Sequence, residues 1–195
     1  MGRGRKSPLL LCDGAEIMKN SLLALSLCAF FVLVCPFQEG HAEEVYLDPD
    51  TFLAEVFGSS LPDPEVVWIT KDRKSVTSRI MTHGKGPRRI RYWADAIRTA
   101  WILEEIGKVR PITTGYVVKS GRIERVAVLI YRESRGWEVR HKFFTDQFVG
   151  ATVDADYRLD RYIDGISGAT LSVDALTRLG RLALYLTEEI TAENK

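Results

Sequence analysis

The sequence predicts an α+β fold: a small, largely antiparallel sheet with helices packed on it, ending in a long C-terminal helix. Two patterns carry this prediction. Residues 112–131 contain two apolar runs separated by Lys119-Ser120-Gly121, which is typical of a β-hairpin. Residues 172–191 carry apolar side chains at three- and four-residue spacing, which is typical of an amphipathic helix.

Residues 1–42 are expected to be an N-terminal extension and signal peptide. Met18-Lys19-Asn20 is a short basic start, residues 21–35 are apolar and uncharged, and Gly40-His41-Ala42 offers small residues for cleavage after Ala42. The apolar run is shorter than the about 20 residues of a comfortable membrane span. We therefore expect a periplasmic or otherwise extracytoplasmic protein, and an uncleaved membrane anchor remains open.

The composition of residues 43–195 limits the function. They carry 23 basic and 23 acidic residues, a balance that argues against nucleic acid as a partner. All three cysteines (Cys12, Cys28 and Cys35) precede residue 43, so the mature chain has none for a disulfide, an iron–sulfur cluster or a thioether-linked haem. No metal site is expected, because His83 and His141 lie far apart in the sequence. Redox work would therefore need an organic cofactor.

Residues 43–97 are expected to be the N-terminal part of the mature domain, and they match no named pattern. An amphipathic helix is predicted over 43–61 and a short strand or buried turn over 66–69. The polar segment 71–91, punctuated by glycine and proline, is predicted to be a loop with one strand near 78–82.

Four elements are expected after residue 97. The apolar block 100–106 is predicted to be a strand, and residues 112–131 the hairpin. Residues 132–160 are expected to be irregular, with Phe143, Phe144 and Phe148 on one face of a helical turn and the last two in the core. The helix over 172–191 should bury one stripe of side chains: Val173, Leu176, Leu179, Leu182, Ala183 and Leu186.

Residues 164–170, Asp-Gly-Ile-Ser-Gly-Ala-Thr, lie between a polar loop and this helix. The two glycines allow the backbone to bend and to approach a ligand closely. The helix start offers N–H groups and a partial positive charge to a phosphate, and Thr170 presents a hydroxyl there. The alternative is a glycine-rich turn in which Ser167, Thr170 or Ser172 only caps the helix.

Four motifs in order resemble one known family. They are Gly121-Arg122-Ile123, Glu133-Ser134-Arg135-Gly136-Trp137, the Phe-x-x-Gln-Phe-x-Gly block over 144–150, and residues 164–170. Over residues 98–190 the chain is similar to the FMN-binding domain family, whose members include flavin-carrying components of the sodium-pumping NADH:quinone oxidoreductase and of the related Rnf complex.

The resemblance implies covalent FMN. In the family, a flavin transferase that uses FAD and a divalent metal attaches FMN through its phosphate to the last residue of Asp-x-x-Ser-Gly-Ala-Thr. This implies a phosphoester on Thr170, with Asp164, Ser167, Gly168 and Ala169 presenting that threonine.

The resemblance also places the turn of Glu133, Ser134, Gly136 and Trp137 beside the flavin. The Glu133 carboxylate is expected to hydrogen-bond the ring or the ribityl chain, and Trp137 either stacks on the ring or is an ordinary aromatic of the core or rim. The chain departs from the family's Glu-Thr-Pro-Gly-Leu at Ser134-Arg135 and at Trp137. The neighbouring cations are expected on the surface, where one of them could stabilise reduced flavin: Arg132, Arg135, Arg140 and Lys142.

The resemblance thus implies an exported flavoprotein that relays electrons outside the cytoplasmic membrane, with no catalytic residue of its own. The expected redox partners are a membrane quinone oxidoreductase and a cytochrome or reductase. Three alternatives remain open: a non-catalytic assembly or sensor subunit, a flavin-dependent reductase of a small exported substrate, and a flavin-free domain.

Overall fold

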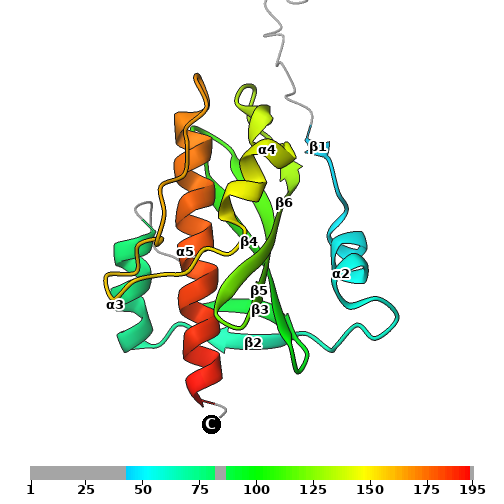
Figure 1. Ribbon diagram of the computed structural model, residues 1–195, viewed down its shortest axis with the longest axis vertical. Coiled ribbons are helices and arrows are strands. Elements are labelled where there is room, and N and C mark those ends of the chain that lie inside the picture. The colour runs from blue at the N-terminus through cyan, green and yellow to red at the C-terminus, as the bar shows by residue number, and fades with distance from the viewer. Residues whose placement is uncertain (1–42, 82–86, 194–195) are drawn as a thin grey trace, which may run out of the picture. The chain divides into compact units, whose positions relative to one another are not determined.

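A six-stranded antiparallel sheet forms the centre of the structure, a computed structural model that describes residues 43–81 and 87–193 (Figure 1). The strands are β1 (Glu44–Val45), β2 (Glu65–Trp68), β3 (Arg89–Ala94), β4 (Arg98–Ile106), β5 (Pro111–Lys119) and β6 (Arg122–Tyr131). Their order across the sheet is β1-β6-β5-β4-β3-β2. The predicted α+β class with an antiparallel sheet is confirmed.

The predicted hairpin is confirmed as β5 and β6. Ser120 and Gly121 connect the strands with positive φ values of 51° and 73°, the conformation that a two-residue hairpin turn requires. The predicted strand over 100–106 is confirmed as part of β4. Each of these strands pairs with its neighbour in the sequence, which is why local patterns were sufficient to predict them.

The long C-terminal helix is confirmed as α5 (Thr170–Glu193), which packs on β4 and β5 across one face of the sheet (Figure 1). Every residue of the predicted apolar stripe is buried. Two buried hydrogen bonds fix the helix to the sheet: Tyr116 Oη donates to Leu176 O at 2.6 Å, and Trp101 Nε1 donates to Thr187 Oγ1 at 2.9 Å.

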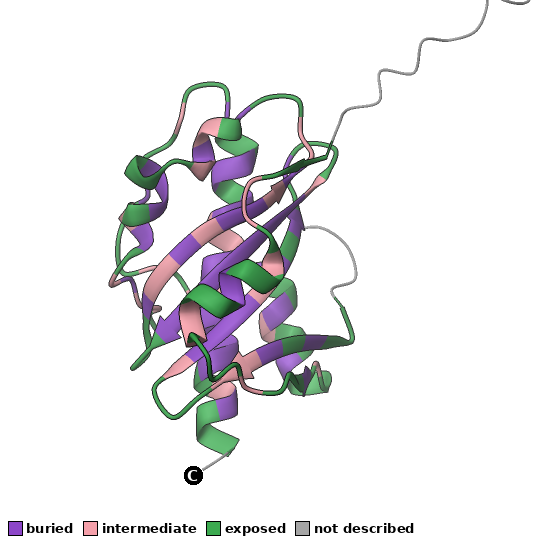
Figure 2. Cartoon of the chain, turned by 90° about the vertical axis from the view of Figure 1, so that its right-hand side faces the viewer, coloured by how far each residue is buried: buried purple, intermediate pink, exposed green. Residues whose placement is uncertain are grey.

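Helix α2 (Pro49–Phe57) covers the opposite face of the sheet, where its outer side is exposed and the strands beneath it are buried (Figure 2). The Asp48 side chain caps the helix by accepting from two N–H groups. Phe52 packs directly on the β5 backbone, because a Cβ on Gly115 would lie 2.5 Å from its ring. The predicted helix over 43–61 was too long, since its first residues pair with β6 as β1 and Gly58 ends α2 with φ +63°.

The prediction of a loop with a strand near 78–82 was wrong, because residues 71–80 form helix α3 (Lys71–Ile80). Two of its three buried residues, Arg73 and Thr77, are polar, so the sequence shows no apolar stripe. Arg73 is buried because it pairs with Glu189, at 3.0 Å, and with Glu193 of α5.

Three short helical segments follow β6: η1 (Trp137–Arg140), α4 (Lys142–Thr145) and η2 (Asp146–Phe148). The core positions predicted for Phe144 and Phe148 are confirmed, since both side chains are fully buried with ring centroids 5.6 Å apart. The prediction that Phe143 shares their face was wrong, because 64 % of Phe143 is exposed.

The predicted signal peptide or anchor, residues 1–42, lies outside the described residues. Within the described ranges, the structure contains no helix with the length and apolar character needed to cross a membrane.

Candidate functional site

The start of α5 is the first part of the candidate site. Gly168, with φ +82°, leads the chain into the helix. The Ala169 carbonyl accepts the first helical hydrogen bond, from the Val173 N–H at 3.0 Å, so Ala169 occupies the N-cap position. Alanine has no side-chain acceptor and is a poor N-cap. The N–H groups of the first helical turn therefore remain available to an external acceptor.

The hydroxyl groups around this helix start differ in what they bind. Thr170 and Ser167 are exposed, and neither hydroxyl forms a hydrogen bond with any of the described residues. Ser172 is buried, and its hydroxyl lies 3.0 Å from Tyr131 Oη. The geometry therefore shows none of the three capping α5, and it leaves the Thr170 hydroxyl free.

The turn after β6 packs against this helix start. Gly136 has φ +84°, and a Cβ there would lie 3.0 Å from the Ala169 Cβ and 3.1 Å from Ser172 Oγ. Only a residue without a side chain allows the two backbones to approach this closely. The fold thus brings together two motifs, residues 133–137 and 164–170, that 26 residues separate in the sequence.

Tyr131 fastens the turn to the helix. Its hydroxyl donates to the Arg135 carbonyl at 2.5 Å, so the contact with Ser172 has the serine hydroxyl as donor. Burial raises the pKa of the Tyr131 hydroxyl, which therefore stays protonated and able to donate at neutral pH.

Glu133 holds the loop between β4 and β5. Its Oε1 accepts from the backbone N–H groups of Lys108, Val109 and Arg110 at 2.5, 2.6 and 2.8 Å. The family resemblance implies that this carboxylate lies beside the flavin, and it gave no indication of the contact with the loop. The composition of the loop, Gly-Lys-Val-Arg-Pro between two apolar runs, was the available signal. A hydrogen bond from Glu133 to a flavin stays a prediction.

These three segments enclose a hollow of about 460 Å³. The residues that line it are Lys108, Glu133, Ser134, Arg135, Gly168, Ala169, Leu171 and Ser172. Four of the predicted site residues (Glu133, Ser134, Gly168 and Ala169) line this one space, and none of them lines the larger hollows elsewhere on the described surface. The cations Lys108 and Arg135 share the space with a carboxylate that backbone N–H groups already engage, so the hollow suits an anionic or polar ligand.

Trp137 does not line the hollow. It follows Gly136, is 42 % exposed, and contacts His141 edge-on with ring centroids 5.5 Å apart. The Arg140 guanidinium lies 4.8 Å from the Trp137 ring centroid. Its position is on the rim, and stacking on a flavin stays a prediction.

Asp164 is exposed, and its backbone N–H donates to Gln147 Oε1 at 2.7 Å. This bond joins the Phe-x-x-Gln-Phe-x-Gly block to the segment that leads to Thr170. The Phe-x-x-Gln-Phe-x-Gly pattern alone predicted no role for Gln147. The role depends on a tertiary contact that no local pattern reveals.

The Thr170 side chain lies on a second hollow, of about 330 Å³, which Arg158, Arg161 and Arg181 also line. Burial and the nearby Arg158 lower the pKa of Arg181, as expected where cations gather. These arginines were not predicted from the sequence.

These features fit the phosphate of an FMN. The donors that a phosphate ester on Thr170 needs are N–H groups at a helix start and nearby guanidinium groups, and both are present. The polar hollow on the other side of the helix start offers space for the rest of the molecule. Among the described residues, no cluster of three or more His, Cys, Asp or Glu side chains could hold a metal ion.

A comparison with known protein families finds a match in the second half of the chain. Residues 107–185 match the sequence model of a family described as the FMN-binding domain. The matched range contains the β4–β5 loop, the turn after β6, the Gln147 block and the start of α5. No curated protein matches the chain.

Proposed function

We infer that residues 107–185 are an FMN-binding domain and that the protein is therefore a flavoprotein. From this premise we propose that the protein carries FMN as a phosphoester of Thr170. We also propose that it relays electrons between redox proteins outside the cytoplasmic membrane. The observation that carries the proposal is the exposed hydroxyl of Thr170, which has no hydrogen-bond partner in residues 43–81 and 87–193 and lies at a helix start whose N-cap is alanine.

Attachment would use the Thr170 hydroxyl as the nucleophile. Its Oγ forms a bond to the phosphorus of the FMN half of FAD, and the phosphoanhydride bond breaks. AMP leaves with the bonding electrons, and the threonine proton passes to a base supplied by the flavin transferase. The exposure of Thr170 supports this step, because a separate enzyme must reach the hydroxyl.

The residues of the site would then hold the product. The N–H groups of the first turn of α5 and the guanidinium groups of Arg158 and Arg161 are the candidates for the phosphate. Lys108, Glu133 and Arg135 are the candidates for the polar edge of the flavin. The bound flavin supplies reversible electron transfer, and the protein positions it and adjusts its electrostatic surroundings.

Relay between proteins is supported by the exposure of the site. Leu171, which lines the hollow, is 46 % exposed. Val109 and Trp137, which lie within two residues of the lining residues Lys108 and Arg135 in the sequence, are 69 % and 42 % exposed, and another protein could cover these apolar side chains. Because the chain has no cysteine after residue 42, a second redox centre that needs cysteine ligands would have to come from a partner. We propose a membrane quinone oxidoreductase and a cytochrome or reductase as the two partners.

Export is proposed from the pattern of residues 18–42. N-terminal sequencing of the protein from its native envelope should find Glu43 as the first residue. A chain that retains residues 21–35 would instead be held by an anchor.

The attachment is tested by expressing the protein with an active flavin transferase. The wild type should gain the mass of one FMN less one water and should fluoresce on a denaturing gel. Thr170→Ala should lose both signals and remain folded, since the Thr170 hydroxyl makes no hydrogen bond with the described residues. Ser167→Ala is the matched control, because it removes the other free hydroxyl of the motif. Flavin found on Ser167 or Ser172, or on no residue, would refute the ester on Thr170.

A further inference from the structure

The middle of β6 is an open sheet edge. On the side away from β5, Tyr46 and Leu47 donate to the Leu129 carbonyl, and β1 pairs only with Ile130 and Tyr131. At the other end of β6, Gly150 and Ala151 exchange hydrogen bonds with Ile123 at 2.7 and 3.0 Å. Between these contacts, residues 124–128 have no neighbouring strand on this side within the described part of the chain.

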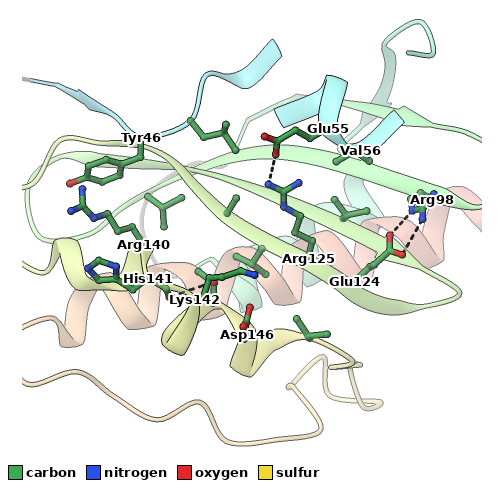
Figure 3. A pocket seen from close by; sticks show the side chains of 17 residues that line it. Tyr46, Glu55, Val56, Arg98, Glu124, Arg125, Arg140, His141, Lys142 and Asp146 are labelled. Carbon is green, nitrogen blue, oxygen red and sulfur yellow. Dashed lines mark hydrogen bonds and ion pairs between the residues drawn. The ribbon is translucent and has the colours of Figure 1, made fainter. Parts of the chain in front are cut away.

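This edge lies at the bottom of a groove of about 760 Å³ (Figure 3). Glu55 and Val56 of α2 form one wall, and the other wall comes from the α4 segment. Residues 124–128 could pair with about five residues of an added strand, or about 17 Å of extended chain. A sheet edge between two walls is the geometry used when a peptide adds itself to a sheet as a further strand.

The two walls differ in chemistry. The α2 wall is largely apolar, because Leu47 and Val56 line it and the Glu55 carboxylate is neutralised by Arg125 at 2.6 Å. The α4 wall carries two cations, Arg140 and Lys142, beside the His141 ring and one carboxylate, that of Asp146. Successive side chains of an added strand point to opposite faces of the sheet. A segment that alternates apolar and acidic residues would complement both walls.

A second copy of the chain fits less well as an occupant. It would have to present the same β6 edge, and in each copy that edge is recessed between the same two walls, so the two edges could not come into contact.

We propose that the β6 groove binds an extended segment of a partner protein, with alternating apolar and acidic side chains, by strand addition to residues 124–128. The proposal does not depend on FMN attachment. The groove nevertheless ends close to the candidate flavin site, since Arg140 lies between the rings of Tyr46, at 4.1 Å, and Trp137, at 4.8 Å. An occupant would therefore reach the turn after β6.

The test uses isotope-labelled protein and a capped heptapeptide of alternating valine and glutamate as the probe. The amide signals of residues 124–128 should shift on titration, and hydrogen exchange should slow at the alternate amides among them that face away from β5. The same peptide with N-methylated amides along the pairing edge should not bind. A peptide with lysine in place of glutamate should bind more weakly.

A pair of variants tests the α4 wall. Lys142→Glu should weaken binding of the glutamate peptide about fivefold, as expected when an attraction at a partly exposed position becomes a repulsion. Lys74→Glu, on the exposed side of α3, is the matched control and should leave binding unchanged.

Three results would overturn the proposal. The first is the absence of any shift at residues 124–128 at the solubility limit of the peptide, which would mean that the edge is protected. The second is equal binding of the N-methylated or lysine peptide. The third is self-association of the protein that perturbs the same amides, which would mean that a second copy of the chain occupies the β6 edge.

Discussion

Gln147 and Asp164 are joined by a hydrogen bond, at 2.7 Å, from the Asp164 backbone N–H to the Gln147 side-chain oxygen. Gln147 is held in place by its neighbour Phe148, which is fully buried against Phe144. The bond therefore ties the exposed segment that leads to Thr170 to a rigid part of the core. Correct presentation of a residue to a modifying enzyme depends on such anchoring.

Gln147→Leu should slow FMN attachment to Thr170 while the protein stays folded, because the Asp164 segment loses its anchor. Gln147→Glu retains an acceptor oxygen and should restore most of the rate. The measurement is the time course of the mass increase with purified transferase and FAD. Equal rates for wild type and Gln147→Leu would mean that the anchor has no part in presentation.

Glu133→Ala should destabilise the loop between β4 and β5, because three backbone N–H groups lose their acceptor. The expected cost is about 1–3 kcal/mol in the free energy of unfolding. Faster hydrogen exchange should be confined to the amides of Lys108, Val109 and Arg110. Glu133→Gln keeps an uncharged acceptor and should recover part of the loss. Unchanged exchange in the alanine variant would contradict the loop-holding role.

Gly136→Ala should cost about 2–4 kcal/mol in the free energy of unfolding, from a residue with positive φ and from overpacking against Ala169 and Tyr131. Gly150→Ala is the matched control: its φ is +80°, but the nearest atom to an added Cβ is the flexible end of Arg161 at 3.7 Å. Chemical denaturation of both variants separates the two effects. Equal losses would mean that close packing at Gly136 adds nothing beyond backbone strain.

Local patterns were sufficient for most of the fold. The hairpin of β5 and β6 and helix α5 were predicted because each carries its own periodicity in one continuous segment. Helix α3 was missed because it buries Arg73, whose partners Glu189 and Glu193 come from the far end of the chain. In the sequence, a polar residue that is buried in the fold looks like one in an exposed loop, because the partners that allow its burial are not part of the local pattern.

For the candidate site, too, the sequence predicts the continuous motifs and not the contacts between separate segments. The Thr170 motif is continuous, so its residues were found together. The role of Glu133 toward the β4–β5 loop and the role of Gln147 toward Asp164 each join separate segments, and no sequence pattern contains them. The arginine residues near Thr170 were missed for the same reason, since Arg158 and Arg181 meet only in the folded chain.

The segment between η2 and the Thr170 loop should loosen at low pH. Asp160 Oδ1 accepts from Arg161 Nε at 3.1 Å and from the Thr152 N–H at 3.2 Å, and the Arg161 bond is the main reason that the Asp160 pKa lies below its ordinary 3.8. A lowered carboxyl pKa stabilises the folded state above 3.8, and this contribution is lost as the pH falls through the folded value.

Asp160→Asn tests this effect. The difference in free energy of unfolding between wild type and variant should be constant well above pH 3.8 and should shrink below it. Chemical denaturation of wild type and variant across this pH range gives the difference in free energy of unfolding. The contribution of the other carboxylates cancels in this difference, because both proteins share them. A difference that does not change with pH would show that the Asp160 charge has no net effect on stability.

Trp137→Ala tests whether the exposed indole contacts the flavin. Trp137 follows Gly136 in the turn after β6, and its ring contacts His141 and Arg140. Because it is 42 % exposed, its removal should leave the fold intact. If the indole lies against the ring, the flavin absorption bands or the midpoint potential should shift, while the flavin stays attached through Thr170. Phe143→Ala is the matched control, since that side chain is 64 % exposed and stacks on His141 without adjoining the hollow. Spectra and potentials that match the wild type in both variants would assign Trp137 to the rim, with no part in setting the flavin environment.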